Sequence, residues 1–299
     1  MNKNSIIGIS SLLGAALIWG LAFSAQKTGM KYLTPEVFTC FRSFIGVAVL
    51  FPLILVVGKI KKTPLIPEDR TERKNLVVGG IWCGVVLSMA STTQQYGLIY
   101  SSAGKAGFIT SLYIIFVPAA GIFFRHKVSV LHWFAVALAL VGSWLLCEPG
   151  SGTALQIGDV WLFVCALLFS CHILVIDHFA PKADCIKMSC IQFLTAGVLT
   201  GIAALVKQDC CSMELVKNCA GALLYCGVCS SGIAFTLQII SQKYIAGQTA
   251  SILMSMESVF AVVGGYIFLG EKLSAVELTG CAVILAAVIL AQLKFSKNS

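Results

Sequence analysis

The chain has 299 residues, of which 58% are hydrophobic and only 11% are charged. Soluble domains average roughly 45–50% apolar and about 25% charged residues, so this chain has too few charges to cover a water-exposed surface. The composition therefore excludes an ordinary soluble protein. The net charge of +8 is explained below by where the basic residues lie along the chain, so no nucleic-acid partner is expected.

Ten apolar stretches follow one another, most of them about 20 residues long, the length that an α-helix needs to cross ~30 Å of hydrocarbon. The alternating strands of a membrane β-barrel are missing from the pattern. The apolar core of the first stretch is longer than that of a cleaved signal peptide, so we expect a retained helix. We predict an all-α integral membrane protein. Its ten predicted transmembrane helices are Ile6–Ala25, Pro35–Val57, Leu76–Tyr96, Ala103–Phe124, Val128–Leu146, Gly158–Asp177, Cys185–Val206, Cys219–Ser241, Gly247–Leu269 and Ala275–Leu293.

The distribution of Lys and Arg predicts the orientation, because these residues collect in the cytoplasmic loops of membrane proteins. With the N-terminus inside, fourteen of them lie on the inner side and six on the outer side, and Arg42 lies within a span. Both termini are therefore expected in the cytoplasm of a multi-pass protein of the plasma (inner) membrane. The six outer residues are Lys27, Lys31, Lys105, Lys207, Lys217 and Lys272.

Two segments of the chain match each other without a gap. The segment "CGVVLSMASTTQQ" (83–95) and the segment "CGVCSSGIAFTLQ" (226–238) lie 143 residues apart and share six of thirteen residues. Chance between two apolar helices would give one or two identities. Further on, "RHKVS" (125–129) aligns with "GEKLS" (270–274) at an offset of 145. We therefore predict two repeats, 1–150 and 151–299, that descend from one duplicated unit.

Each predicted repeat holds five spans, which is an odd number, so the second repeat must enter the membrane from the opposite side. Two inverted five-helix repeats, related by a pseudo-twofold axis in the membrane plane, are typical of secondary transporters. Exchange of roles between the repeats gives inward-open and outward-open states. The repeat pattern therefore favours a transporter over a receptor or an enzyme.

The sequence resembles the EamA-like ten-helix carriers of the drug/metabolite transporter superfamily. The resemblance rests on "LLGAALIWGLAFSAQK" (12–27), Arg42 in the second span, "AGFITSLYIIFVPAAG" (106–121) and "SILMSMESVFAVVGGYIFLGEKLS" (251–274). It implies that small organic metabolites or drug-like solutes cross the plasma membrane by alternating access, by import or export. The expected partners are the solute and the lipid bilayer, while a coupling ion and a homodimer stay open. No cofactor is expected.

The polar residues of the two matching segments fall on one helical face in each. Small residues at such positions also pack helices together, and the glycines of the face fit that alternative equally well. The amides are better explained as cavity lining, because a buried amide without a partner is costly. The residues predicted to line the solute pathway from these two segments are Ser88, Ser91, Gln95, Ser231 and Gln238.

Two charged residues lie within predicted spans, Arg42 in the second and Glu257 in the ninth. Such charges usually face a bundle interior or a wet cavity, so we predict that both belong to the pathway. Arg42 could instead extend to the headgroups, and Glu257 could instead make a structural hydrogen bond at a helix terminus. Glu257 is the candidate for coupling or for binding a cationic group of the solute.

Three aromatic residues, Trp19, Phe23 and Tyr113, are candidates for stacking on the solute, although aromatic side chains in membrane helices more often only pack. Trp19 and Tyr113 are included in the predicted pathway. The rival hypothesis is a membrane-embedded enzyme or lipid-handling protein that uses His172 and Asp177. Five residues on a helix place these two side chains about 140° apart, so an enzyme is not expected.

The thirteen cysteines are scattered and lie mostly inside predicted spans, where a free cysteine behaves as a small apolar residue. Cys226 and Cys229 form a lone C-x-x-C pair without a histidine or a second pair. No metal site is therefore predicted.

Overall fold

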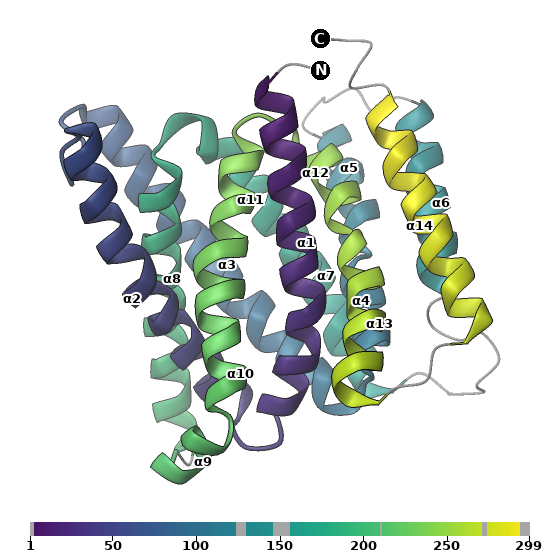
Figure 1. The fold of residues 1–299 in the computed structure, drawn as a ribbon. Helices are drawn as coiled ribbons and strands as arrows, with labels where there is room; N and C mark the ends of the chain where they lie inside the picture. Colours follow the sequence, from purple (N-terminus) through teal and green to yellow (C-terminus); the bar gives the residue numbers. More distant parts are fainter. Residues whose placement is uncertain (1–2, 124–129, 146–155, 210, 271–273, 294–299) are drawn as a thin grey trace.

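The computed structural model of the protein describes residues 3–123, 130–145, 156–209, 211–270 and 274–293. These residues form a bundle of helices (Figure 1) and contain no strand. The first half comprises α1 (Lys3–Gly29), α2 (Pro35–Lys61), α3 (Arg70–Tyr100), α4 (Ala103–Thr110), α5 (Tyr113–Phe123) and α6 (Val130–Leu145). The second half comprises α7 (Ile157–Phe179), η1 (Ala180–Lys182), α8 (Cys185–Lys207), α9 (Met213–Asn218), α10 (Ala220–Leu224), η2 (Tyr225–Ala234), α11 (Phe235–Gln242), α12 (Gly247–Met254), α13 (Met256–Leu269) and α14 (Ala275–Leu293).

Within the described ranges, eight helical stretches are long and apolar enough to cross a membrane. Two further apolar stretches, Trp133–Gly142 and Leu278–Leu290, are shorter and lie in α6 and α14. The prediction of an all-α protein that crosses the membrane several times is confirmed, whereas the count of ten spans and their inverted arrangement stay predictions. The predicted boundary between residues 150 and 151, and the predicted span ends at 124, 128 and 146, lie outside the described residues.

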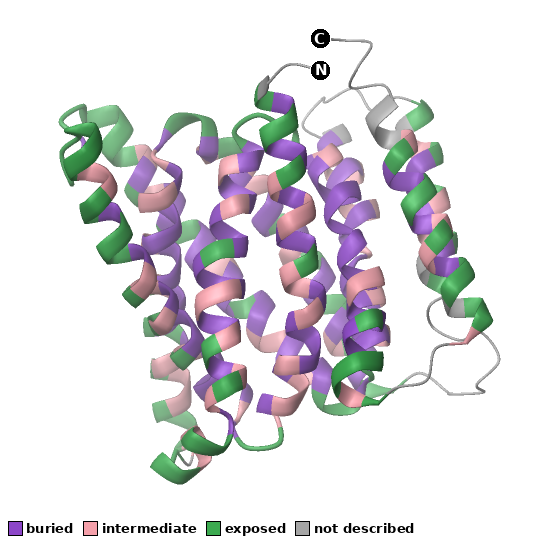
Figure 2. Ribbon diagram, in the orientation of Figure 1, coloured by how far each residue is buried: buried purple, intermediate pink, exposed green. Residues whose placement is uncertain are grey.

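Burial divides the long helices into an inner and an outer face (Figure 2). Large apolar side chains such as Phe51, Leu194 and Ile202 are exposed on the outside of the bundle, as expected of a surface in contact with lipid tails. Polar side chains are turned inward instead, and Gln95, Gln192 and Ser231 are fully buried. This inside-out distribution fits a protein in a bilayer, where lipid covers the apolar surface.

Local signals in the sequence fix several helix starts. Asp69 precedes α3 and its carboxylate accepts a hydrogen bond of 2.7 Å from the backbone N–H of Glu72. Asp184 does the same for α8, where it accepts from the N–H groups of Ile186 and Lys187. These side chains satisfy backbone donors that have no partner inside the helix.

Two predicted spans that the hydropathy pattern presents as continuous are interrupted in the middle. The fourth predicted span is broken between α4 and α5 at Ser111 and Leu112, and the ninth is broken between α12 and α13 at Ser255. The two serines are 144 residues apart, and each hydroxyl donates a 2.7 Å hydrogen bond to the carbonyl three residues earlier. Such a bond favours a bend in the helix, but Ser88 makes the same bond within the continuous helix α3, so the bond alone does not cause a break. The two breaks nevertheless lie at matching positions of the two halves.

The eighth predicted span contains a third irregularity. Its central part, η2 (Tyr225–Ala234), is a π-helix, and the N–H of Phe235 donates to the carbonyl of Ser230, five residues earlier. A π-helical turn takes more residues than an α-helical turn, so it shifts which side chains face inward. Neither the small residues of this segment nor its hydropathy predicts a π-helix.

The helix pairs follow the correspondence of the two halves. When each helix is replaced by its counterpart in the other half, the same set of pairs results. At one edge of the bundle α2 packs on α8, and at the other edge α6 packs on α14 (Figure 1). Inside, α3 packs on α7, while the corresponding segments η2 and α11 pack on α1. Close approach depends on glycine at some crossings: a Cβ added to Gly84 of α3 would lie 2.6 Å from the carbonyl oxygen of Gln192 in α8. The packing alternative is therefore confirmed for this glycine of the polar face.

Candidate functional site: a polar cavity between the two halves

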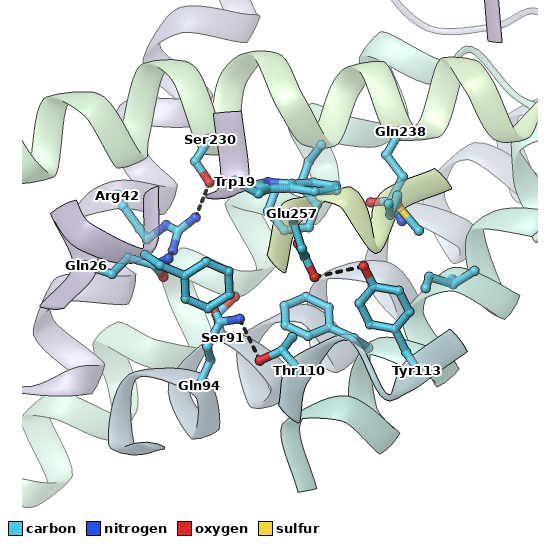
Figure 3. A pocket seen from close by; sticks show the side chains of 15 residues that line it. Trp19, Gln26, Arg42, Ser91, Gln94, Thr110, Tyr113, Ser230, Gln238 and Glu257 are labelled. Carbon is cyan, nitrogen blue, oxygen red and sulfur yellow. Dashed lines mark hydrogen bonds between the residues drawn. The ribbon is translucent and has the colours of Figure 1, made fainter. Parts of the chain in front are cut away.

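A cavity lies in the middle of the bundle, at the level of the two helix breaks (Figure 3). Its walls come from α1, α2, α3 and the α4–α5 break in the first half, and from α7, η2, α11 and the α12–α13 break in the second half. The empty volume is about 470 Å³ with the mouth included, so a guest is limited to a small molecule. The cavity is thus shared between the halves.

Arg42 forms one end of the cavity and is 4% exposed. Its guanidinium donates hydrogen bonds to Gln26 Oε1 at 2.8 Å, to Ser230 Oγ at 2.7 Å and to Ser231 Oγ at 3.3 Å. Gln26 Oε1 also accepts from Gln95 Nε2 at 2.6 Å. The guanidinium therefore lies inside the bundle and joins α1 and α2 to η2, and the alternative that it extends to the headgroups is wrong.

Glu257 lies in the first turn of α13, immediately after the break at Ser255, and its side chain points into the cavity (Figure 3). The Tyr113 hydroxyl, which belongs to the first residue of α5 after the other break, donates to Glu257 Oε1 at 2.8 Å. A helix N-terminus carries a partial positive charge and stabilises a nearby carboxylate. The breaks of the two halves are thus joined by one hydrogen bond inside the cavity.

Amide and hydroxyl groups line the space between these two ends. Gln94 Nε2 lies 3.5 Å from Thr110 Oγ1, at the limit of a hydrogen bond. Gln238 is 2% exposed, and its Oε1 is buried without a hydrogen-bond donor among the described residues. The indole N–H of Trp19 is likewise buried without an acceptor there. The cavity wall therefore keeps hydrogen-bonding capacity that the protein itself does not use.

Aromatic rings form the apolar part of the wall. Trp19 and Phe235 meet edge to face with ring centroids 4.7 Å apart, and Phe169 stacks on Phe235 at 6.5 Å. Phe23, which the sequence marks as a candidate for stacking, also lines the cavity. An apolar or aromatic part of a guest would find its contacts here.

The structure brings six of the nine predicted pathway residues together at the cavity and leaves three outside its lining. Ser231 and Gln95 lie behind the wall, where they hydrogen bond to Arg42 and to Gln26. Ser88 donates to the Val85 carbonyl of its own helix at 2.7 Å. The six residues at the cavity are Trp19, Arg42, Ser91, Tyr113, Gln238 and Glu257.

Sequence reasoning missed four polar residues of the lining: Gln26, Gln94, Thr110 and Ser230. Gln94 and Ser230 are direct neighbours of the predicted Gln95 and Ser231. Ser230 lies within the π-helix η2, whose turn differs from that of an α-helix, whereas Gln94 lies in the continuous α-helix α3. Gln26 is the fifteenth residue of the quoted segment 12–27, and only its polarity within an apolar span marks it.

The two residues of the rival enzyme hypothesis are not brought together. His172 is fully buried, with Nε2 3.1 Å from Gln192 Oε1 of α8. Asp177 Oδ1 accepts a 2.7 Å hydrogen bond from the backbone N–H of Gly247 at the start of α12. Each side chain has a separate structural partner, and this hypothesis is not favoured.

Several proteins with similar sequences are named as transporters. An uncharacterized transporter of Archaeoglobus fulgidus is 29% identical over 286 residues, covering 93% of this chain and 83% of the relative. The uncharacterized transporter YoaV of Bacillus subtilis is 23% identical, with 96% and 97% covered, and the uncharacterized inner membrane transporter YedA of Escherichia coli is 21% identical, with 95% and 90% covered.

Solved structures share the fold; one of them has a TM-score of 0.75 at 16% sequence identity, with 99% of both chains covered. The model of the EamA-like transporter family matches residues 6–147 and 156–293. These two segments make up most of the chain. The chain therefore belongs to the EamA-like transporter family of the drug/metabolite transporter superfamily.

Proposed function

We propose that this protein is a secondary transporter that moves a small organic solute across the plasma membrane by alternating access through the central cavity. The observation that carries the proposal is a central cavity whose wall is built by both halves at the level of two matching helix breaks. Interrupted helices at mid-membrane that face a site between repeats are typical of secondary transporters.

The proposal includes ten spans in two inverted five-helix repeats, 1–150 and 151–299. Three observations support it. The family model matches two successive segments of similar length. Each packed pair of helices has a counterpart in which the two halves take each other's places. Furthermore, Ser111 and Ser255 make the same hydrogen bond in each half.

The proposed orientation places both termini in the cytoplasm. The excess of Lys and Arg on one side supports it, and α1 begins at the same end of the bundle at which α14 ends (Figure 1). The printed name of the Escherichia coli relative places that protein in the inner membrane, which supports the plasma membrane as the location here.

At the end assigned to the outside, charged residues join the two halves. Lys207 of α8 contacts Glu36 Oε1 of α2 at 2.5 Å and the Tyr96 hydroxyl of α3 at 2.6 Å. Lys105 of α4 contacts Asp159 of α7 at 2.8 Å. These contacts hold the halves together on the outer side of the cavity, which supports an outward-closed state as one of the two states of the cycle.

Transport by the purified chain in proteoliposomes tests the proposal. Vesicles are screened with labelled metabolites, and the solute recovered from the lumen is identified chemically. A transporter delivers the solute unchanged, whereas an enzyme would deliver a product. If no solute crosses faster than in protein-free vesicles, or if only converted products are recovered, the proposed function is wrong.

A further inference from the structure

A second hollow lies away from the central cavity, where α2 ends and α8 begins. The last turns of α2, the connection from α2 to α3 and the first turn of α8 enclose about 860 Å³, with the open mouth included. We infer that this lysine groove binds an anionic phospholipid, whose phosphate is held by Lys59, Lys62 and Lys187. The inference goes beyond the proposed function, because it requires only that the chain crosses a membrane.

Three positive charges from different parts of the chain meet at the lysine groove. Lys59 and Lys62 lie at the end of α2, whereas Lys187 lies in the first turn of α8. None of the ion pairs among the described residues includes one of them. Glu68 is the one acidic residue in the described lining, so positive charge is in excess. An anion in the groove would relieve the repulsion between the lysines.

Backbone contacts hold the basic groups in place. Lys62 has a left-handed backbone (φ 52) that ends α2, and the N–H groups of Lys62 and Thr63 both donate to the carbonyl of Gly58. From α8, Lys187 Nζ donates a 2.6 Å hydrogen bond to the carbonyl of Pro64. A lysine ammonium has three donors, so two donors of Lys187 remain for phosphate oxygens.

Two general tendencies already account for lysines at the end of α2. Basic residues collect in cytoplasmic loops, and the C-terminus of a helix favours a nearby cation. Neither explains Lys187. The N-terminus of α8 carries a partial positive charge that disfavours a cation in the first turn, and the cytoplasmic bias does not require this side chain to reach across to the α2–α3 connection. An anion bound in the groove gives that arrangement a physical reason.

The apolar part of the groove favours a lipid over a small soluble anion. Ile54, Leu55 and Leu65 line the same groove as the lysines, and Leu55 and Leu65 are exposed. Figure 1 shows α2 at an edge of the bundle, and Figure 2 shows this end of α2 as largely exposed. A phospholipid supplies both a phosphate and, next to it, acyl chains for the apolar wall. Basic pockets of this kind at the cytoplasmic side of membrane helices bind lipid headgroups.

Lipid binding to the purified full-length protein tests the inference. Labelled phosphatidylglycerol and labelled phosphatidylcholine are each titrated onto the protein in micelles of a neutral detergent. Each lysine near an anionic lipid contributes about a fivefold gain in affinity, so we expect phosphatidylglycerol to bind at least about tenfold more tightly. Glycerol phosphate and inorganic phosphate at the same concentrations should not displace it, because they lack acyl chains.

Variants assign the binding to the lysine groove. Lys187→Gln should weaken phosphatidylglycerol about fivefold, and the triple variant that adds Lys59→Gln and Lys62→Gln should weaken it at least about tenfold. Binding of phosphatidylcholine should stay unchanged in both. Glutamine is compatible with the left-handed backbone at position 62, since Gln208 has the same conformation (φ 56) at the end of α8. The melting temperature of each variant shows whether it is folded.

A matched triple variant controls for the loss of charge. Lys74→Gln, Lys182→Gln and Lys243→Gln remove three exposed charges on the side assigned to the cytoplasm, outside the groove lining, and should leave lipid binding unchanged. Equal affinity for the two lipids would overturn the inference. So would an equal loss in the two triple variants, a folded groove variant that binds phosphatidylglycerol normally, or displacement of the lipid by inorganic phosphate.

Discussion

At the scale of single residues, the cavity depends on a few polar side chains with defined partners. Glu257 and Tyr113 are hydrogen bonded across the two helix breaks, and their side chains come from matching positions of the two halves. A carboxyl group at this position can change its protonation state when the halves move and its surroundings change. That makes Glu257 the candidate for linking solute movement to protons.

Glu257→Gln keeps the shape of the side chain and removes the change of charge. We expect transport of the solute found in the screen to fall at least about tenfold, because the variant loses a charged contact. The dependence of transport on pH should also flatten, because the glutamine cannot gain or lose a proton. Initial rates in proteoliposomes over a series of pH values measure both effects. Tyr113→Phe, which removes only the hydrogen-bond donor, should keep the pH dependence. Full transport with an unchanged pH profile in Glu257→Gln would make this residue structural.

At the scale of elements, helix irregularities and close glycine contacts determine what faces the cavity. The breaks at Ser111 and Ser255 expose the starts of α5 and α13, and the π-helix η2 turns Ser230 inward. Straight α-helices through the same residues would present different side chains. Neighbouring helices approach closely at glycines: Gly227 of η2 faces Ile45 of α2, and Gly84 of α3 faces Gln192 of α8.

Gly84→Ala tests that close approach. Its Cβ would lie 2.5 Å from Thr195 Cβ and 2.6 Å from the Gln192 carbonyl, and overpacking of this kind costs about 1–3 kcal/mol. We expect a lower melting temperature in detergent. The matched control is Gly221→Ala in α10, where nothing lies within 4 Å of the added Cβ and helix propensity favours alanine by about 1 kcal/mol. Equal melting temperatures for the two variants would contradict the packing assigned to α3 and α8.

At the scale of the whole molecule, the two halves are tied at the end assigned to the outside. The Lys207 contacts with Glu36 and Tyr96 join α8 to α2 and α3, and deeper in the bundle Gln95 is fully buried against Gln26. In the proposed alternating-access cycle, the outer contacts would break before Gln95 meets water. On that proposal, the population of the outward-open state depends on these contacts.

Lys207→Gln should shift the population toward that state. In a cysteine-free background with Gln95→Cys, we expect an outside impermeant thiol reagent to label position 95 severalfold faster when Lys207 is replaced. Gln238→Cys, probed from inside, should change in the opposite sense. Lys217→Gln, another lysine on the side assigned to the outside, is the control and should leave both rates unchanged. If neither position is ever labelled, the polar face is packing and the pathway is wrong.

The orientation has a separate test. Figure 1 shows α9 at the opposite end of the bundle from the connection between α2 and α3, so single cysteines at Lys61 and Lys217 should lie on opposite sides of the membrane. We expect an impermeant reagent added to intact cells to label position 217 and to leave position 61 unlabelled until the cells are opened. Labelling of both positions in intact cells would overturn the proposed topology.

The amino-acid sequence by itself determined the all-helical membrane class and the family. Apolar stretches of spanning length and the order of the loose motifs can be recognised in the sequence without knowledge of the tertiary structure. It also marked Arg42, Glu257 and Trp19, since charged and aromatic side chains within apolar spans stand out by type alone. It did not determine which neighbour of a polar pair faces inward. Gln94 rather than Gln95, and Ser230 rather than Ser231, line the cavity.

Those choices were made by the tertiary structure. For Ser230, a helical face read from sequence assumes one constant turn, whereas the π-helix η2 changes the turn locally. α3 is a continuous α-helix, and there Gln95 is engaged by a hydrogen bond to Gln26 of α1. Contacts with other helices accompany these changes, as where Ser230 and Ser231 of η2 accept hydrogen bonds from Arg42 of α2. The Arg42 network shows the same cause, because its partners Gln26 and Ser230 come from α1 and η2, segments whose proximity to α2 arises only when the two halves pack together.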